Sequence, residues 1–223
     1  ILELLGEPMA LEHVGFGMVL GEDGKPKKTR DVSGKVETLA MLLDEAEARA
    51  EAKMIAELDL PADMARSLAP AVGIGAVKYA DLVQNRLSNY QFSWEKLIAF
   101  DGDAGPYLQF AHARASSIFR KGELDRASIA GPIVLEDPTE KALGRKLVRF
   151  GDVVHQASEQ RYPHFIAEHV YSLCKEYSRF LESCRVLDSQ GPTRESRIAL
   201  VDLTARQIRR GLSLLGIDAP ERM

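Results

Sequence analysis

In the second half of the chain, apolar residues recur every three or four positions through four successive stretches, and this spacing constrains the fold more than any other feature. The stretches cover residues 107–121, 138–160, 163–183 and 194–215. Such spacing puts apolar side chains on one face of an α-helix. Helices of this kind bury those faces against one another, so the sequence predicts a helical bundle. Gly216 is expected to end the last helix, whose apolar face would consist of Ile198, Val201, Ala205, Ile208, Leu212 and Leu215.

The first half mixes strand and helix patterns. Residues 11–20 alternate in polarity, which predicts a strand that ends at the turn residues 21–24. Thr38 is expected to cap an amphipathic helix, and Pro61 is expected in the first turn of another. Pro70 should end or kink that second helix before a further helical segment.

The strongest loop signal is Asp101–Pro106, with the sequence DGDAGP. We expect the domain boundary there, with one domain over residues 1–100 and a second over residues 101–223.

Composition sets limits on partners and location. The net charge of −4 lacks the strong basic signature of a non-specific nucleic-acid binder, so a polyanion would have to meet a local basic patch. No run approaches the roughly 18 apolar residues of a membrane span, and no signal peptide is readable, so we expect a cytoplasmic protein without a membrane partner. Cys174 and Cys184 are too far apart along one helix to bridge and are expected to be buried thiols. The chain starts at Ile1 in what looks like the middle of a fold, which suggests a piece of a longer protein.

Several catalytic signatures are missing from the sequence. It has no Walker A loop and no nucleophile motif, and Gly73-Ile74-Gly75 lacks the third glycine of a dinucleotide fingerprint. The histidines have no metal-ligand spacing with one another or with the cysteines, so no tightly bound metal is expected. His164 and His169 are expected at the surface or at helix caps.

A basic loop, Lys25–Arg30, joins the expected strand to the first helix. Its cations and the Thr29 hydroxyl could neutralise a triphosphate in an adenylating or phosphoryl-transfer reaction. A solvated basic loop without a ligand is the alternative.

The helix that begins after Gly105 carries two stripes. Leu108, Ala111, Ala115 and Ile118 form the expected core stripe. A second stripe, Tyr107, Phe110 and Arg114, lies about 100° around the helix from the first. Aromatic rings beside a guanidinium hold unstacked RNA bases, although the rings could instead widen the core stripe.

The last helix has an arginine cluster. Arg206, Arg209 and Arg210 lie within about one turn, and they form either a phosphate contact or a solvated polar face.

Five segments in this order resemble the C-terminal half of the arginyl-tRNA synthetases, a family of class I aminoacyl-tRNA synthetases. The resemblance covers nearly the whole chain. It rests on Leu11–Val19 (LEHVGFGMV), Gly24–Arg30 (GKPKKTR), Gly73–Leu82 (GIGAVKYADL) followed by Asn85-Arg86, Gly105–Arg114 (GPYLQFAHAR) and Leu214–Met223 (LLGIDAPERM).

For the first domain, the resemblance implies an ATP site. Lys25 and Lys28 correspond to the two lysines of the class I Lys-Met-Ser-Lys-Ser signature and would act on the triphosphate of ATP as catalytic residues. Thr29 and Arg30 follow in the same loop, while His13, Gly15, Phe16 and Gly17 would lie near the adenine. Pro26 and Lys27 depart from the Met and Ser of the signature.

For the second domain, the resemblance implies anticodon binding. Tyr107, Phe110 and Arg114 match positions that pack against anticodon-loop nucleotides, and Met223 falls where the family's chain end approaches the anticodon. Leu181 stands where the family commonly has the second residue of a Phe-Tyr pair.

The fold that this resemblance implies is mainly α: a C-terminal remnant of a class I Rossmann-type α/β catalytic domain, followed by a helical-bundle anticodon-binding domain. The implied function is that of an arginine–tRNA ligase, which uses ATP with Mg and L-arginine as substrates and tRNA for arginine as partner. We expect a monomer that does not bind DNA, and no activity from this chain alone, because the His-Ile-Gly-His-like signature and the arginine pocket are missing. The alternative is a non-enzymatic helical module of the same ancestry that binds a protein.

Overall fold

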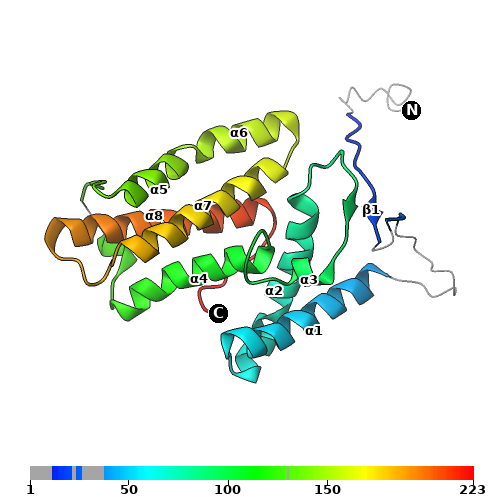
Figure 1. Cartoon of the computed structure of the whole chain (residues 1–223), viewed down its shortest axis with the longest axis horizontal. Coiled ribbons are helices and arrows are strands. Elements are labelled where there is room, and N and C mark those ends of the chain that lie inside the picture. Colours follow the sequence, from blue (N-terminus) through cyan, green and yellow to red (C-terminus); the bar gives the residue numbers. More distant parts are fainter. Residues whose placement is uncertain (1–11, 22–23, 27–37, 130) are drawn as a thin grey trace, which may run out of the picture.

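The computed structural model describes residues 12–21, 24–26, 38–129 and 131–223, and it is mainly helical (Figure 1). A short 3₁₀ turn at Arg126–Ser128 separates α4 from α5. The other elements, in chain order, are β1 (Val19–Leu20), α1 (Leu39–Leu58), α2 (Ala62–Leu82), β2 (Tyr90–Gln91), α3 (Trp94–Leu97), α4 (Gly105–Lys121), α5 (Pro138–Val148), α6 (Phe150–Gln160), α7 (His164–Ser183) and α8 (Gly191–Leu214).

Helices α1 and α2 form an antiparallel pair with its own core. The hydroxyl of Thr38 accepts the backbone N–H of Met41, which confirms the predicted N-cap. Ala46, Ala50 and Met54 of α1 are buried against apolar residues of α2 and α3. This cluster forms the smaller of two hydrophobic cores.

Pro70 was predicted to end or kink this helix, and the first alternative is wrong, because α2 continues through Pro70. Proline removes one backbone hydrogen bond from a helix. Here Ala65 and Ala69 before Pro70 and Val72 and Ala76 after it are all buried in the same cluster. Packing on both sides of the proline holds the helix in one piece.

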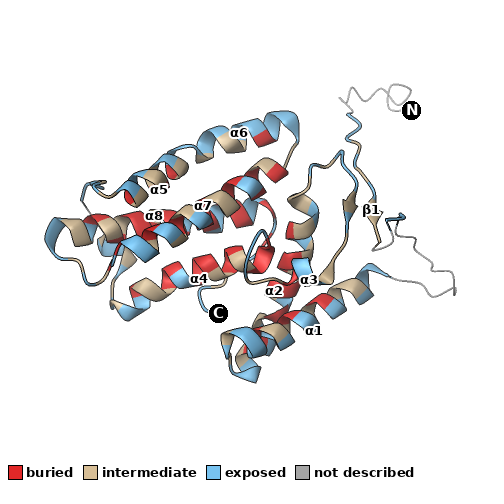
Figure 2. Cartoon of the chain, viewed as in Figure 1, coloured by how far each residue is buried: buried red, intermediate tan, exposed pale blue. Residues whose placement is uncertain are grey.

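The larger core lies among α4, α5, α6, α7 and α8, which confirms the predicted bundle (Figure 2). The single helix predicted over 138–160 is instead two helices, because Arg149 ends α5 and its backbone N–H turns back to the carbonyls of Leu147 and Lys146. The last helix begins at Gly191, three residues before the predicted start, and Gly216 follows it with a φ of +68°. That left-handed conformation confirms Gly216 as the stop.

The predicted strand over residues 11–20 is much shorter than expected. Within its described residues only Val19–Leu20 is strand, paired in parallel with Tyr90–Gln91. A strand needs a neighbour to accept and donate its backbone hydrogen bonds. β2 supplies such a neighbour for two residues only. The alternating residues before Val19 therefore do not extend the pairing into a longer sheet ladder.

Both cysteines are free and buried, as predicted, with Cys184 at the C-cap of α7. The prediction for the histidines is wrong in part. His164 begins α7, but it is buried, and so is His169, whose ring lies 5.6 Å from that of Phe150. Within the described residues, no helix is both long enough and apolar enough to cross a membrane.

Candidate nucleic-acid interface

Helix α4 starts in close contact with α2, and this contact sets the direction of its side chains. A Cβ at position 105 would lie 3.0 Å from the Cβ of Tyr79 and 3.1 Å from the carbonyl oxygen of Gly75. Glycine therefore lets the first turn of α4 pack closely on α2. Pro106 follows at the start of the helix, where its missing N–H costs no hydrogen bond.

The structure brings Tyr107, Phe110 and Arg114 to one side of α4, turned away from the centre of the core stripe. Tyr107 and Phe110 are half-buried and Arg114 is exposed, whereas Leu108, Ala111 and Ala115 are buried. Neither ring is fully enclosed in the bundle. Tyr107 packs against the larger core, and both rings also reach the surface beside a guanidinium. This arrangement is compatible with either explanation of the stripe.

Tyr107 is held by helix α7. Its hydroxyl lies 3.5 Å from the hydroxyl of Ser178, and its ring meets the ring of Tyr171 edge-on, with centroids 5.9 Å apart. Burial is the main cause that raises the pKa of Tyr107, so its hydroxyl stays protonated at neutral pH. A ring fixed in this way loses little freedom when a base stacks on it.

The segment after α8 is tied along the other side of α4. The buried amide of Gln109 donates to the carbonyls of Ala71 and Asp218 at 3.0 and 2.8 Å. The imidazole Nδ1 of His112 lies 2.9 Å from the carbonyl oxygen of Pro220. Burial is the main cause that lowers the pKa of His112, which keeps this histidine neutral.

Two further cations complete this attachment. Lys78 donates to the carbonyl of Gly216, and Arg120 donates to that of Glu221. Met223 then packs against the core of α1, α2 and α3, and the end of the chain lies beside α4 (Figure 1). Sequence reasoning missed these anchors. The polar pair Gln109 and His112, one turn apart on a helix rich in buried residues, was the signal that could have found them.

Residues 12–21 run beside the loop that follows α2. The N–H of Gly17 donates to the carbonyl of Arg86 at 2.6 Å, and the N–H of Met18 donates to Oδ1 of Asn89 at 2.8 Å. A Cβ at position 17 would lie 2.1 Å from the carbonyl oxygen of Ser88, so only glycine fits there.

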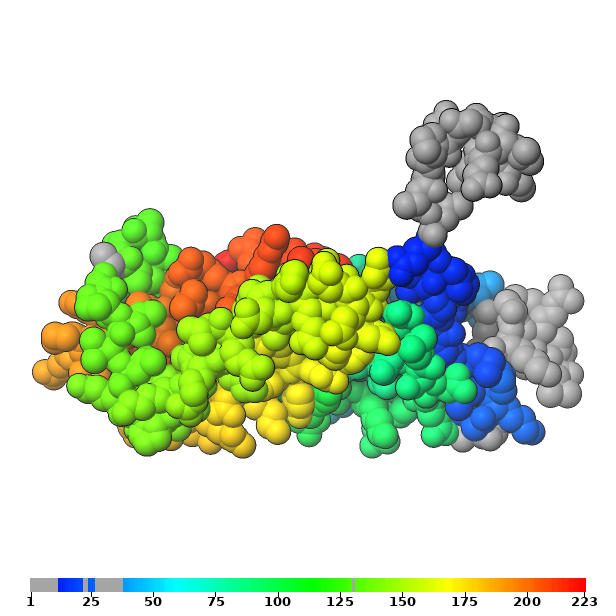
Figure 3. Space-filling view, turned by 90° about the horizontal axis from the view of Figure 1, so that it is seen from above, coloured from blue at the N-terminus to red at the C-terminus, as the bar shows by residue number. Residues whose placement is uncertain are grey.

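Arg86 joins this segment to the turn between α6 and α7. Its Nη1 donates to the carbonyl of Gly15 at 2.6 Å, and its Nε donates to the carbonyl of Arg161 at 2.9 Å. The guanidinium lies 4.8 Å from the ring centroid of Tyr162, and Arg161 pairs with Glu12. Figure 3 shows the turn lying against this segment. Sequence reasoning missed this junction because the two partners of Arg86 lie 71 and 75 residues away.

The residues predicted near ATP are only partly described. His13 is exposed, Gly15 and Gly17 are half-buried, and Phe16 is 86% exposed. Lys25 is exposed in a turn where the N–H of Gly21 donates to its carbonyl at 2.8 Å. The remaining predicted residues of this site, Lys28, Thr29 and Arg30, lie outside the described residues.

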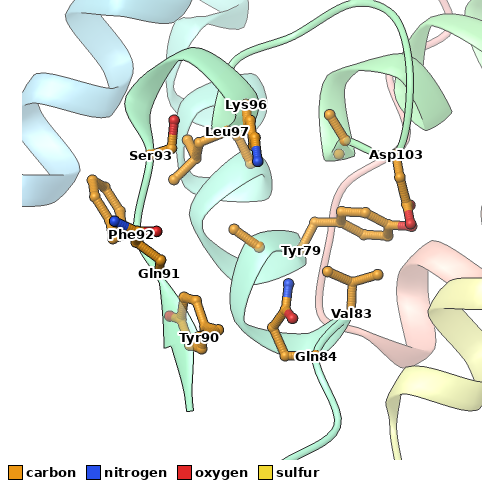
Figure 4. Close-up of a pocket in the computed structure, with 14 residues that line it drawn as sticks. Tyr79, Val83, Gln84, Tyr90, Gln91, Phe92, Ser93, Lys96, Leu97 and Asp103 are labelled. Atoms are coloured by element: carbon orange, nitrogen blue, oxygen red, sulfur yellow. The ribbon is translucent and has the colours of Figure 1, made fainter. Parts of the chain in front are cut away.

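A small pocket of about 120 Å³ lies where α2, the β2 segment and the start of α4 meet (Figure 4). The hydroxyl of Tyr79 donates to Oδ1 of Asp103 at 2.6 Å on one side of it, and Lys96 and Tyr90 lie on the other. Burial, followed by the hydrogen bond to Asp103, raises the pKa of Tyr79. Among the described residues, none that was predicted for function lines this pocket.

The arginines of α8 lie on a different face. Arg206 pairs with Asp202 at 2.8 Å, and Arg209 and Arg210 are exposed. Arg126, Arg206 and Arg209 line an open groove of about 620 Å³. The carboxylate of Asp202 also lies 3.9 Å from Nε of Arg126, so it partly neutralises this groove.

Two family models match different parts of the chain. Residues 108–223 match the family model of the DALR anticodon binding domain. Residues 3–94 match that of the class I tRNA synthetase (R) catalytic domain. The fold is therefore that of a class I aminoacyl-tRNA synthetase portion in which a DALR anticodon-binding domain follows part of the catalytic domain.

Individual relatives of the chain support the same family assignment. The chain is 47% identical over 219 residues to the arginine–tRNA ligase of Laribacter hongkongensis, covering 97% of this chain and 37% of that protein. It is 48% identical to that of Chromobacterium violaceum, with the same coverage. The structure of the Thermus thermophilus arginyl-tRNA synthetase superposes with a TM-score of 0.81 at 31% identity, over 95% of this chain and 35% of that one. The chain belongs to the arginyl-tRNA synthetase family and corresponds to its C-terminal portion.

Proposed function

We propose that this chain supplies the anticodon-recognition part of an arginine–tRNA ligase, and that the whole protein attaches arginine to its tRNA at the expense of ATP. The observation that carries the proposal is the surface of α4, where half-buried Tyr107 and Phe110 lie beside exposed Arg114. Phe110 and Arg114 lie within residues 108–223, which match the anticodon-binding family model, and Tyr107 directly precedes that region. The chain spans about 37% of the length of the curated relatives it matches, so the complete reaction is assigned to the whole protein.

Each residue of the α4 surface has a distinct role in this proposal. The rings of Tyr107 and Phe110 offer apolar faces on which unpaired anticodon bases stack. The guanidinium of Arg114 binds a base edge or a phosphate with several N–H donors. Met223, which packs against the core of α1, α2 and α3 at the end of the tail on the other side of α4, adds an apolar contact to the anticodon loop.

The basic loop acts on ATP in the whole protein. In the first step the carboxylate of arginine attacks the α-phosphate of ATP, arginyl adenylate forms, and pyrophosphate leaves. Lys25 and Lys28 neutralise the charge on the leaving phosphates, together with Mg that accompanies ATP as substrate. Gly15, Phe16 and Gly17, with His13, contact the adenine side, and Thr29 and Arg30 complete the loop.

Three further properties belong to this proposal. The boundary between the catalytic part and the anticodon-binding domain falls near residue 101, between the matched regions 3–94 and 108–223. The protein acts as a monomer in the cytoplasm. The isolated chain carries out no arginine-dependent exchange of pyrophosphate into ATP, and detectable exchange by it would contradict this part of the proposal.

The test is a fluorescence-anisotropy titration of the chain with an arginine tRNA transcript, and with the same transcript changed at the second anticodon base, at one stated salt concentration. We expect tighter binding to the unaltered transcript. Tyr107→Ala and Arg114→Ala should each weaken that binding by about tenfold, which is the effect of losing one stacking or bidentate contact. Arg145→Ala, which removes an exposed arginine from α5, is the matched control and should bind like the unmodified chain. Equal binding to both transcripts, or none, would overturn the proposal.

A further inference from the structure

Helix α7 presents a polar and aromatic stripe next to the α4 surface. Tyr171, Lys175 and Ser178 are spaced by four and three residues, which puts them on one side of the helix. Tyr171 and Ser178 are half-buried, and Lys175 is exposed. Family resemblance assigned none of these residues to RNA binding.

The contacts of Tyr107 make this stripe continuous with the α4 surface. Tyr107 meets the ring of Tyr171 at a centroid distance of 5.9 Å and an angle of 70°, and its hydroxyl lies 3.5 Å from that of Ser178. In an edge-on pair, the two ring faces point in different directions. The rings therefore form two adjacent faces of one surface.

Lys175 lies over the ring of Tyr171. Its Nζ is 5.5 Å from the ring centroid, within the range of a cation–π contact. An ammonium can occupy that position only if the ring face beneath it is not packed against protein. A nucleobase could cover the same face, and the flexible lysine would then reach the phosphate attached to that nucleotide.

We propose that Tyr171 and Lys175 form a second nucleotide-binding contact of the RNA surface, in which the Tyr171 ring stacks on an unpaired base and Lys175 binds that nucleotide's phosphate. This inference rests on the proposed function, because it extends the surface of Tyr107, Phe110 and Arg114 onto α7. The bound RNA then spans two helices, and Tyr107 lies between the two contacts.

The new contact differs from the one that the family places at position 181. Leu181 is half-buried and packs against the bundle core. Ten residues along an α-helix correspond to about 15 Å, so Tyr171 and Leu181 cannot hold the same base. Tyr171 therefore binds a different nucleotide rather than replacing the missing aromatic residue.

The experiment repeats the anisotropy titration with the full chain, an anticodon stem-loop RNA and a series of salt concentrations. Tyr171→Ala should weaken binding by at least about fivefold, whereas Tyr171→Phe, which keeps the ring, should stay within about twofold of the unmodified chain. Lys175→Gln should weaken binding and reduce the slope of log K against log salt by about 0.7, the value for one phosphate of a single strand. Lys141→Gln removes an exposed lysine from α5 and is the matched control, with an unchanged slope.

The outcomes separate this inference from the proposed function. If the chain distinguishes the anticodons and Tyr107→Ala removes that preference, but Tyr171→Ala and Lys175→Gln bind normally, the α7 contact is wrong and the proposed function stands. If the unmodified chain shows no anticodon preference, the result overturns both the proposed function and the α7 contact. Lys175 is exposed, so Lys175→Gln tests the inference even if Tyr171→Ala unfolds.

Discussion

Glu140 and Arg197 form a buried ion pair that joins α5 to α8. Removing one partner of the pair tests how much it stabilises the bundle. Oε1 of Glu140 accepts from Nε of Arg197 at 2.7 Å and from the thiol of Cys184 at 3.9 Å. Oε2 accepts the backbone N–H groups of Glu136 and Asp137 at 2.8 and 3.0 Å. The side chain of Glu140 is 3% exposed and that of Arg197 18% exposed, so water cannot replace the lost partner of the carboxylate.

The perturbation is Arg197→Met, which keeps an apolar chain of similar length and removes the charge. The carboxylate of Glu140 then stays buried with its backbone donors but without a counter-charge. Breaking a buried pair in this way costs about 3–5 kcal/mol. Urea unfolding followed by circular dichroism should report a loss of that size in the free energy of unfolding. The double variant with Glu140→Gln should lose less, because no charge remains to be buried.

The same loss should depend on pH. Burial raises the pKa of Glu140, but the hydrogen bonds from Arg197 and the two backbone N–H groups outweigh it and leave the pKa below its usual value. A carboxyl whose pKa is lower in the folded chain stabilises fully above its unfolded pKa, and this contribution disappears as the pH falls through the lowered value. The difference between the unmodified chain and Arg197→Met should therefore shrink in acid.

Arg210→Met is the matched control, because Arg210 lies exposed on the same helix. It should change the free energy of unfolding by no more than about 0.5 kcal/mol. A loss below about 1 kcal/mol for Arg197→Met, or a loss that stays the same at all pH values, would refute the reasoning about this pair.

Three other substitutions test the packing. Gly211→Ala should destabilise the chain by about 1–3 kcal/mol in urea unfolding, because its Cβ would lie 2.3 Å from Cγ2 of Val170 and force α7 and α8 apart; a neutral effect would contradict this contact. Gly151→Ala should instead stabilise by about 0.5 kcal/mol, because nothing lies within 4 Å of the new methyl group in α6. Lys78→Met removes the donor to the carbonyl of Gly216 and should speed amide exchange in residues 216–223, measured by mass spectrometry; unchanged protection there would show that the other anchors suffice.

Local signals in the sequence were enough to predict most of the helices and to indicate the family. Thr38 lies at the start of α1 and Gly216 just after the end of α8, and each acts through contacts within one turn of its helix. Their positions alone therefore identify these helix ends. The apolar spacing behind α4, α7 and α8 likewise depends on neighbours three and four residues away. The stripe of Tyr107, Phe110 and Arg114 was visible for the same reason.

Tertiary packing decided the remainder, because the deciding partners are distant in sequence. Pro70, which is itself exposed, stays inside α2 because residues before and after it are buried in the core shared with α1 and α3. Arg86 connects residues that are 71 and 75 positions away, and Gln109 reaches one that is 109 positions away. Periodicity carries no information about such pairs. The sequence by itself determined the apolar faces of most helices and the stripe of Tyr107, Phe110 and Arg114, whereas the structure alone decided that α7 lies beside that stripe and that the final residues are tied to α4.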